Sequence, residues 1–426
     1  MNTLPGHAIR GNPFTLALLL CLVFGIGAAV SQSLIITLVA LGSLAGFVLA
    51  LGVARHLRGE EFLAFSALLG YMVLNYGFAN WSVRIGDVPL PIGHLLAFSA
   101  LGLALLRSHG SIGGIFREPA IICVVLLLAL SLPHLLMDFR RYGAYALRDT
   151  SFVVEGLFLV LGIVLARHGG SRKRFTAVLG VIFLANFLHA LTFPVSDLVR
   201  DYSPASGIFL SVPVLGNYRQ TAFFLVAGAC FFLLTGRNLP RWQARILGGL
   251  AILQIAWSFF FQLRSAYIGI FITVGLVLLF RGWRRGRSFV LAVLCAVGLL
   301  FSFLTTVGTT FSGRKGPMDV QFFGGHVQSL VLAEGAPAVG SARWRLELLP
   351  EVWERWTAHP ARIFFGEGFG EPLIDHYRTD RAVATRQPHN THLSVLLRLG
   401  LLGFLVWAVL LWRIFRVLLE IGRAHV

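Results

Sequence analysis

The sequence predicts an all-α polytopic membrane protein with about twelve transmembrane helices and a large outer loop before the last helix. Hydrophobic residues make up 56% of the 426 residues and charged residues only 13%, whereas an ordinary globular domain has about 25% charged residues. A soluble core cannot bury this much apolar surface. The apolar residues also gather in runs of about 20, the length that a helix needs to cross a bilayer.

Twelve apolar runs are the candidate spanning helices. The first follows a short N-terminus without a small-residue cleavage site, so we expect a retained helix rather than a removed signal peptide. For the tight pair over 246–280 a re-entrant hairpin is the alternative. The runs occupy residues 14–30, 34–54, 62–80, 88–106, 119–137, 151–166, 175–193, 220–236, 246–263, 265–280, 288–308 and 391–412.

The basic residues predict the orientation of these helices. A net charge of +17 would suggest nucleic acid as the partner of a soluble protein, but here the basic residues cluster in every second connection between apolar runs. Positive residues collect on the cytoplasmic side, so the alternation places both termini in the cytoplasm. We expect a transmembrane domain over 1–308, a periplasmic loop domain over 309–388, and a last helix with a cytoplasmic tail over 389–426.

Several polar and thiol groups inside the apolar runs are expected to be structural. All four cysteines lie in such runs, where neither a disulfide framework nor a zinc site can be built. Glu155 and Arg398 require partners inside the membrane, and a structural ion pair or hydrogen-bonded network is the favoured explanation. Three histidines within predicted spans are expected to be satisfied core residues: His94, His134 and His189.

The predicted outer side carries many arginines although positive residues usually avoid that side. A guanidinium group stays charged and can bind phosphate through two parallel hydrogen bonds, so such a cluster suits a lipid-linked phosphate or pyrophosphate. Arg343 and Arg386 are candidate ligands of this kind. The alternative is that these arginines pair with lipid headgroups or with the acidic residues Glu347, Glu351, Glu354, Asp375 and Asp380.

Two arginines are stronger candidates for binding the anion. Arg264 interrupts the apolar run over 246–280, which places it at the turn of a tight helical hairpin near the outer boundary of the hydrocarbon. Arg219 stands directly before another span. A charge near lipid is unfavourable, by about 2.5–3.5 kcal/mol at mid-bilayer and less toward the interface, so such residues usually have partners or a function.

Residues 387–392 are predicted to carry the catalytic base. Pro388 and the short polar residues after it predict a helix start, which places His389 at a helix N-terminus. The positive end of the helix dipole disfavours imidazolium, and a neutral ring with a pKa of about 6.5 can accept a proton near neutral pH. His392 lies about 60° around the helix from His389, so both could face one cavity with Asn390. The alternative is an interfacial pair bonded to loop carbonyls. Zinc fits poorly, because no third ligand is evident.

Two segments of the large loop have their own patterns. Residues 343–356 are amphipathic, with a Trp and Leu spacing that suits a helix on the membrane surface. Residues 366–370 read Gly-Glu-Gly-Phe-Gly without a preceding strand, so a tight turn beside the site is favoured over dinucleotide binding.

Together these features resemble the O-antigen ligase and polymerase superfamily of bacterial envelope glycosyltransferases. The ligase branch has His, then Asn, Ser or Gln, nine residues, Gly, two residues and a small or hydroxyl residue. This chain has His389, Asn390, Gly400 and Gly403 at those positions. The large loop before the last span, the Arg264-Ser265 pair and the Trp-rich helix before a Gly-rich turn are also similar. The stretch 216–219 matches the family's Gly-Asn pattern only loosely.

The resemblance implies a C-type glycosyltransferase fold in the bacterial inner membrane that needs no metal or cofactor. Its donor would be an undecaprenyl-pyrophosphate-linked glycan, and its acceptor a hydroxyl of the lipid A-core on the periplasmic face. His389 would be the base, with Arg219 and Arg264 on the pyrophosphate. Two alternatives stay open: a polymerase of O-antigen or exopolysaccharide repeats, and a transporter of a lipid-linked sugar. A transporter would favour charges in mid-membrane and an internal repeat.

Overall fold

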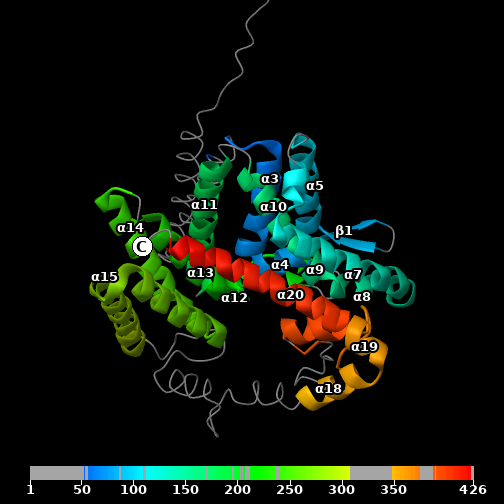
Figure 1. Ribbon diagram of the computed structural model, residues 1–426. Helices are drawn as coiled ribbons and strands as arrows, with labels where there is room; N and C mark the ends of the chain where they lie inside the picture. The colour runs from blue at the N-terminus through cyan, green and yellow to red at the C-terminus, as the bar shows by residue number, and fades with distance from the viewer. Residues whose placement is uncertain are drawn as a thin grey trace, which may run out of the picture.

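The computed structural model of the chain describes residues 52, 56–85, 88–108, 112–167, 171–193, 196–201, 203, 205–206, 212–236, 239–307, 348–374, 387–388 and 390–423. The predicted span over 14–30 and all but residue 52 of the span over 34–54 lie outside these residues, as does most of the predicted loop domain. The described part is almost entirely helical (Figure 1), which agrees with the predicted all-α class.

The helices follow one another with short connections and two small antiparallel β-hairpins. The hairpins pair β1 (Ser82–Ile85) with β2 (Val88–Pro91) and β3 (Ala205–Ser206) with β4 (Val212–Pro213). The helices are α3 (Gly59–Leu69), the π-helix η1 (Gly70–Leu74), α4 (Asn75–Ala79), α5 (Ile92–Arg107), α6 (Ile112–Ile115), α7 (Pro119–Tyr142), α8 (Ala144–Asp149), α9 (Ser151–Val154), α10 (Gly156–Arg167), α11 (Ser171–Leu191), α12 (Ser196–Asp201), α13 (Thr221–Thr235), α14 (Arg241–Ser258), the 3-10 helix η4 (Phe259–Phe261), α15 (Arg264–Val307), α18 (Leu349–Thr357), α19 (Pro360–Phe365) and α20 (Thr391–Arg423).

Within the described residues, five helical stretches are long and apolar enough to cross a membrane. They are Gly59–Ala79, Pro119–Tyr142, Arg174–Leu191, Arg241–Phe261 and Thr391–Val417. Shorter apolar helices occupy Ile92–Arg107, Thr221–Thr235, Ser265–Gly275 and Phe289–Gly298. All of these overlap predicted spans, so the apolar runs located the helices correctly. The total of twelve spans stays a prediction.

The connection that we predicted between residues 280 and 288 is helical in the structure. Helix α15 continues through it as one element of 44 residues. At 1.5 Å per residue this is about 66 Å, roughly twice the hydrocarbon thickness of a bilayer. Figure 1 shows α15 as two stretches that meet at an angle, so its two halves correspond to the two predicted spans. Arginine is a good helix former, and a basic cluster alone therefore does not end a helix.

Helix α20 bends sharply at Gly400, where φ is 65° and ψ is −166°. In a straight helix His392 and Trp407 would lie about 22 Å apart along the axis. Their ring centroids are 6.5 Å apart, and the Trp407 Nε1–H donates to His392 Nδ1 at 3.1 Å. The segment before Gly400 and the segment after it therefore fold toward each other.

The loop after α19 fills the bend of α20 and supplies the hydrogen bonds that the bend removes. The Glu367 N–H donates to the Leu397 carbonyl at 2.8 Å, and the Gly368 N–H donates to the Arg398 carbonyl at 3.1 Å. A Cβ atom on Gly400 would lie 2.3 Å from the Phe364 carbonyl. Only glycine combines this positive φ with such a close backbone approach. The bend thus explains why a glycine stands at position 400 of the ligase-like motif.

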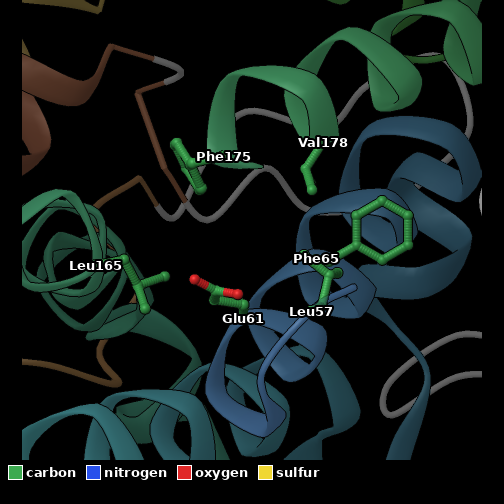
Figure 2. A pocket seen from close by; sticks show the side chains of 6 residues that line it. All are labelled: Leu57, Glu61, Phe65, Leu165, Phe175 and Val178. Atoms are coloured by element: carbon green, nitrogen blue, oxygen red, sulfur yellow. The ribbon is translucent and has the colours of Figure 1, made fainter. Parts of the chain in front are cut away.

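Ion pairs between distant segments gather at opposite ends of α7, a helix of 24 residues. At its N-terminal end Arg107 pairs with Glu60, Arg174 with Glu61, and Arg167 with Glu118. These residues lie in or beside connections that we predicted on the cytoplasmic side. A small pocket at this end is lined by the Glu61 carboxylate and by the apolar side chains of Leu57, Phe65, Leu165, Phe175 and Val178 (Figure 2).

At the other end of α7, Asp138 and Tyr142 contact the loop after α19. Residues predicted on one side of the membrane therefore meet at one end of the bundle. Which end faces the cytoplasm stays a prediction.

We predict that Gly400→Ala destabilises the protein by about 1–3 kcal/mol or more, because alanine is strained at this φ and its Cβ meets the Phe364 backbone. The midpoint of thermal unfolding in detergent measures this effect. Gly102→Ala in α5 is the matched control, since a Cβ there meets nothing within 4 Å. Equal midpoints for Gly400→Ala and wild type would contradict the bend.

Candidate functional site

Arg219 lies on the turn before α13, with its side chain exposed. Its guanidinium carbon stands 4.7 Å from the centroid of the Tyr76 ring. Among the described residues, no carboxylate pairs with this guanidinium. Arg148, Arg200, Arg355, Arg362 and Arg398, by contrast, each pair with an acidic residue. Arg219 is thus a cation held by an aromatic face, and its charge is not neutralised by a described acid.

The segment that carries Arg219 packs against the segment that carries Arg264. Arg264 begins α15 shortly after η4, which agrees with the predicted tight turn between two helices. Tyr218, Phe261 and Ala266 are buried in one cluster, with Leu263 packed on it. The ring centroids of Tyr218 and Phe261 are 6.1 Å apart. The structure therefore brings the two segments together; the side chain of Arg264 itself is outside the described part.

The start of α20 agrees with the sequence prediction. Asn390 precedes Thr391, the first helical residue, and its Oδ1 accepts hydrogen bonds from His392 N at 3.0 Å and from Leu393 N at 3.3 Å. This is an N-cap, which satisfies free N–H groups of the first turn. The predicted base His389 and the predicted ligands Arg343 and Arg386 lie outside the described residues. His392 is bonded to Trp407, so a role in a shared cavity stays a prediction.

A fully buried ion pair lies close to this helix start. Arg398 is 1% exposed, and its Nη2 lies 2.7 Å from Oδ2 of Asp149, whose side chain is 0% exposed. The Arg398 Nη1–H also donates to the Gly368 carbonyl at 3.0 Å. Arg398 was predicted to take part in a structural network, and this is confirmed. Its acidic partner is Asp149 of α8; Glu155 forms no ion pair among the described residues.

The loop over 366–370 is held to α7 and α8 by two carboxylates. Phe369 N–H donates to Asp138 Oδ2 at 2.7 Å, and Gly370 N–H donates to Asp149 Oδ2 at 3.2 Å. Asp149 Oδ1 also accepts a hydrogen bond from Gln387 Nε2 at 3.4 Å, just before the predicted base. The tight turn predicted here is confirmed, with positive φ at its three glycines. We call Asp138, Asp149, Arg398 and this loop the outer clasp.

Several outer arginines proved structural, in line with the alternative that we weighed for them. Arg355 donates to both carboxylate oxygens of Glu367, at 2.8 and 2.7 Å, and Arg362 pairs with the same carboxylate at 3.2 Å. Their acidic partner, Glu367, is not among the acidic residues that we expected to pair with these arginines. Part of the predicted amphipathic helix over 343–356 is present as α18; its place on the membrane surface stays a prediction.

Two of the core histidines differ from the prediction. His189 stacks on Tyr218 with centroids 4.7 Å apart, and His94 stacks on Phe98 at 6.0 Å, so both rings are packed as expected. Yet neither Nε2 atom has a hydrogen-bond partner among the described residues. The expectation of satisfied histidines is therefore wrong for these two Nε2 atoms, as far as the described residues go.

Asp138 and Asp149 are the site residues that the sequence analysis missed. They stand in the predicted outer connection over 138–150, where only the arginines were noticed. A carboxylate beside a basic pair at a span end is a weak signal, and the partners 366–370 are more than 200 residues away in the chain.

We predict that Asp149→Asn destabilises the protein by about 3–5 kcal/mol, because it leaves the Arg398 charge buried without its partner. Thermal unfolding in detergent and the yield of folded protein measure this loss. Glu118→Gln is the matched control: its partner is Arg167, both side chains are well exposed, and the expected change is about 0–1 kcal/mol. Similar midpoints for the two variants would show that the pair is not buried as described.

Comparison with known proteins finds one similarity, in the C-terminal part of the chain. Residues 259–408 match the model of the family described as O-antigen ligase. The matched stretch contains Arg264, His389, Asn390 and Gly400, whereas Arg219 and Asp149 precede it. No match was found among curated proteins or among solved structures. This stretch, about a third of the chain, is therefore similar to the O-antigen ligase family.

Proposed function

We propose that this protein is an O-antigen ligase, which transfers a glycan from undecaprenyl pyrophosphate to a sugar hydroxyl of the lipid A-core at the periplasmic face of the inner membrane. The observation that carries this proposal is the exposed Arg219, whose guanidinium lies over the Tyr76 ring, next to Tyr218, which packs against the start of α15. A cation with no described acid partner, beside the segment of a second arginine, suits a pyrophosphate. The family match supports a lipid-linked glycan as the ligand.

In this proposal the transfer is a single displacement. The acceptor oxygen attacks the anomeric carbon, the bond from that carbon to the pyrophosphate oxygen breaks, and the configuration inverts. The imidazole of His389 accepts the proton of the attacking hydroxyl. Arg219 and Arg264 stabilise the negative charge that grows on the pyrophosphate as it leaves. The products are the glycosylated acceptor and undecaprenyl pyrophosphate.

The outer clasp has a defined part in this mechanism. Asp149 joins Arg398, the glycine turn and Gln387, so the chain is held on both sides of position 389. Asn390 caps the helix that follows. Rigid placement of a base within reach of the reacting hydroxyl can contribute a large part of a rate enhancement. These residues position the proposed base and do not themselves react.

A polymerase of glycan repeats is the alternative, because it would use the same residue types with a second lipid-linked glycan as acceptor. The His-Asn spacing to Gly400 favours the ligase. Disruption of the gene separates the two functions. Loss of a ligase leaves long polymer on the carrier lipid, whereas loss of a polymerase leaves single capped repeats.

We predict that His389→Ala lowers the transfer rate by about 10²–10⁴-fold, since a positioned base contributes this much, while binding of the donor lipid is kept. The assay uses purified protein in nanodiscs with donor and acceptor, and it measures the release of undecaprenyl pyrophosphate. His359→Ala, an exposed histidine before α19, is the matched control. Full activity of His389→Ala would remove the assignment of the base. A transporter would release no lipid pyrophosphate even as wild type.

Arg264→Lys is expected to lower the transfer rate at least about tenfold, because an ammonium group cannot replace the planar, two-pronged guanidinium on a pyrophosphate. The same assay measures the change. Arg416→Lys, on the exposed end of α20, is the control and should leave the rate unchanged. If Arg264→Lys transfers as fast as wild type, Arg264 only anchors its turn at the interface.

A further inference from the structure

Asn75 has an unusual backbone conformation for a residue that is not glycine. It directly follows the π-helix η1 and has φ of 55° and ψ of −127°. Its side chain is almost fully buried, with 1% exposed. Both features are unfavourable without compensation, and such backbone strain and π-helical turns are often found at functional sites. Contacts with other residues must therefore stabilise Asn75 in this buried, strained conformation.

The compensation comes from the residues next to Arg219. Asn75 Oδ1 accepts a hydrogen bond from Gln220 N at 2.9 Å. Asn75 Nδ2 donates to Thr221 Oγ1 at 3.2 Å and to the Met72 carbonyl at 3.0 Å. One buried amide thus ties the end of the π-helix to the two residues that follow Arg219 in the chain.

Tyr76, the next residue, contacts Arg219 itself. The guanidinium stands over the ring at 4.7 Å from its centroid, which is within the range of a cation–π interaction. This contact pairs the guanidinium with no acceptor oxygen, so its N–H donors remain able to bind an anion. Those donors are the atoms that bind a phosphate through two parallel hydrogen bonds.

Gly77 completes the contact between the two segments. A Cβ atom there would lie 2.4 Å from the Val214 carbonyl oxygen and 2.7 Å from the Pro213 carbonyl oxygen. The consecutive residues 75–77 therefore contact both the start and the end of the stretch over 213–221.

We infer that Asn75 and Tyr76 are positioning residues, which orient the Arg219 guanidinium so that its edge faces the pyrophosphate of the lipid-linked donor. Asn75 fixes the backbone beside Arg219, and Tyr76 fixes the plane of the guanidinium. This inference rests on the proposed function. It goes further by assigning a role to residues outside the matched family stretch, in a predicted span where Asn75 precedes Gln220 by 145 positions.

Substitutions of Tyr76 test the inference through donor binding. The full-length protein is placed in nanodiscs, and the Kd and the kcat/KM are measured for an undecaprenyl-pyrophosphate-linked glycan. Tyr76→Leu should weaken donor binding roughly 2- to 30-fold, the strength of one cation–π contact, and Tyr76→Phe should restore it because the ring face remains. Tyr145→Leu, which removes the ring under Arg148, is the matched control and should bind as wild type does.

A double-mutant comparison separates positioning from a general effect on folding. In an Arg219→Gln background Tyr76→Leu should cause no further loss of donor affinity. Asn75→Gly adopts the positive φ without strain but removes the hydrogen bonds to Gln220 and Thr221. It should therefore remain folded and still bind the donor more weakly than wild type.

The outcomes distinguish this inference from the proposed function. If wild-type protein does not bind the donor lipid, the proposed function fails and the inference fails with it. If wild type binds the donor but Tyr76→Leu and Asn75→Gly bind it equally well, the inference alone is overturned. It is also overturned if Tyr76→Leu weakens binding by the same factor with and without Arg219.

Discussion

The end of the bundle that we predict to face outward depends on the buried ion pair between Asp149 and Arg398. It joins α8, the glycine turn and α20, which are distant in the chain. A buried charge is tolerated only when its partner and its remaining hydrogen bonds are present, and here backbone groups of the turn supply them. Because Arg398 lies just before the bend at Gly400, the same interaction fixes the direction in which α20 begins.

The general architecture could be predicted from the sequence because lipid imposes a simple rule on composition and length. Every apolar helix of the described part overlaps an apolar run of the sequence. The start of α20 was also predictable, since an Asn after a Pro is a local signal that a helix can use as a cap. The two arginines singled out for their unusual places lie on segments that share one packed cluster.

Contacts between distant residues could not be predicted. Asp149 pairs with Arg398, 249 positions away in the chain. Tyr76 of one predicted span contacts Arg219, which lies directly before a different span. A glycine within an apolar run predicts nothing about a bend unless the backbone that approaches it is known, as Phe364 approaches Gly400. The basic stretch between residues 280 and 288 predicted a connection between two helices. In the structure this stretch is itself helical, as part of α15.

We propose that two arrangements act together in the transfer: the Arg219 guanidinium over the Tyr76 ring, and the outer clasp, which holds the chain around the proposed base. The most direct measurement is a cryo-EM structure of the protein with bound undecaprenyl-pyrophosphate-linked glycan. The account predicts both phosphorus atoms next to the guanidinium groups of Arg219 and Arg264, with His389 facing the anomeric carbon. A pyrophosphate bound elsewhere, or His389 on the opposite side of the membrane, would contradict it.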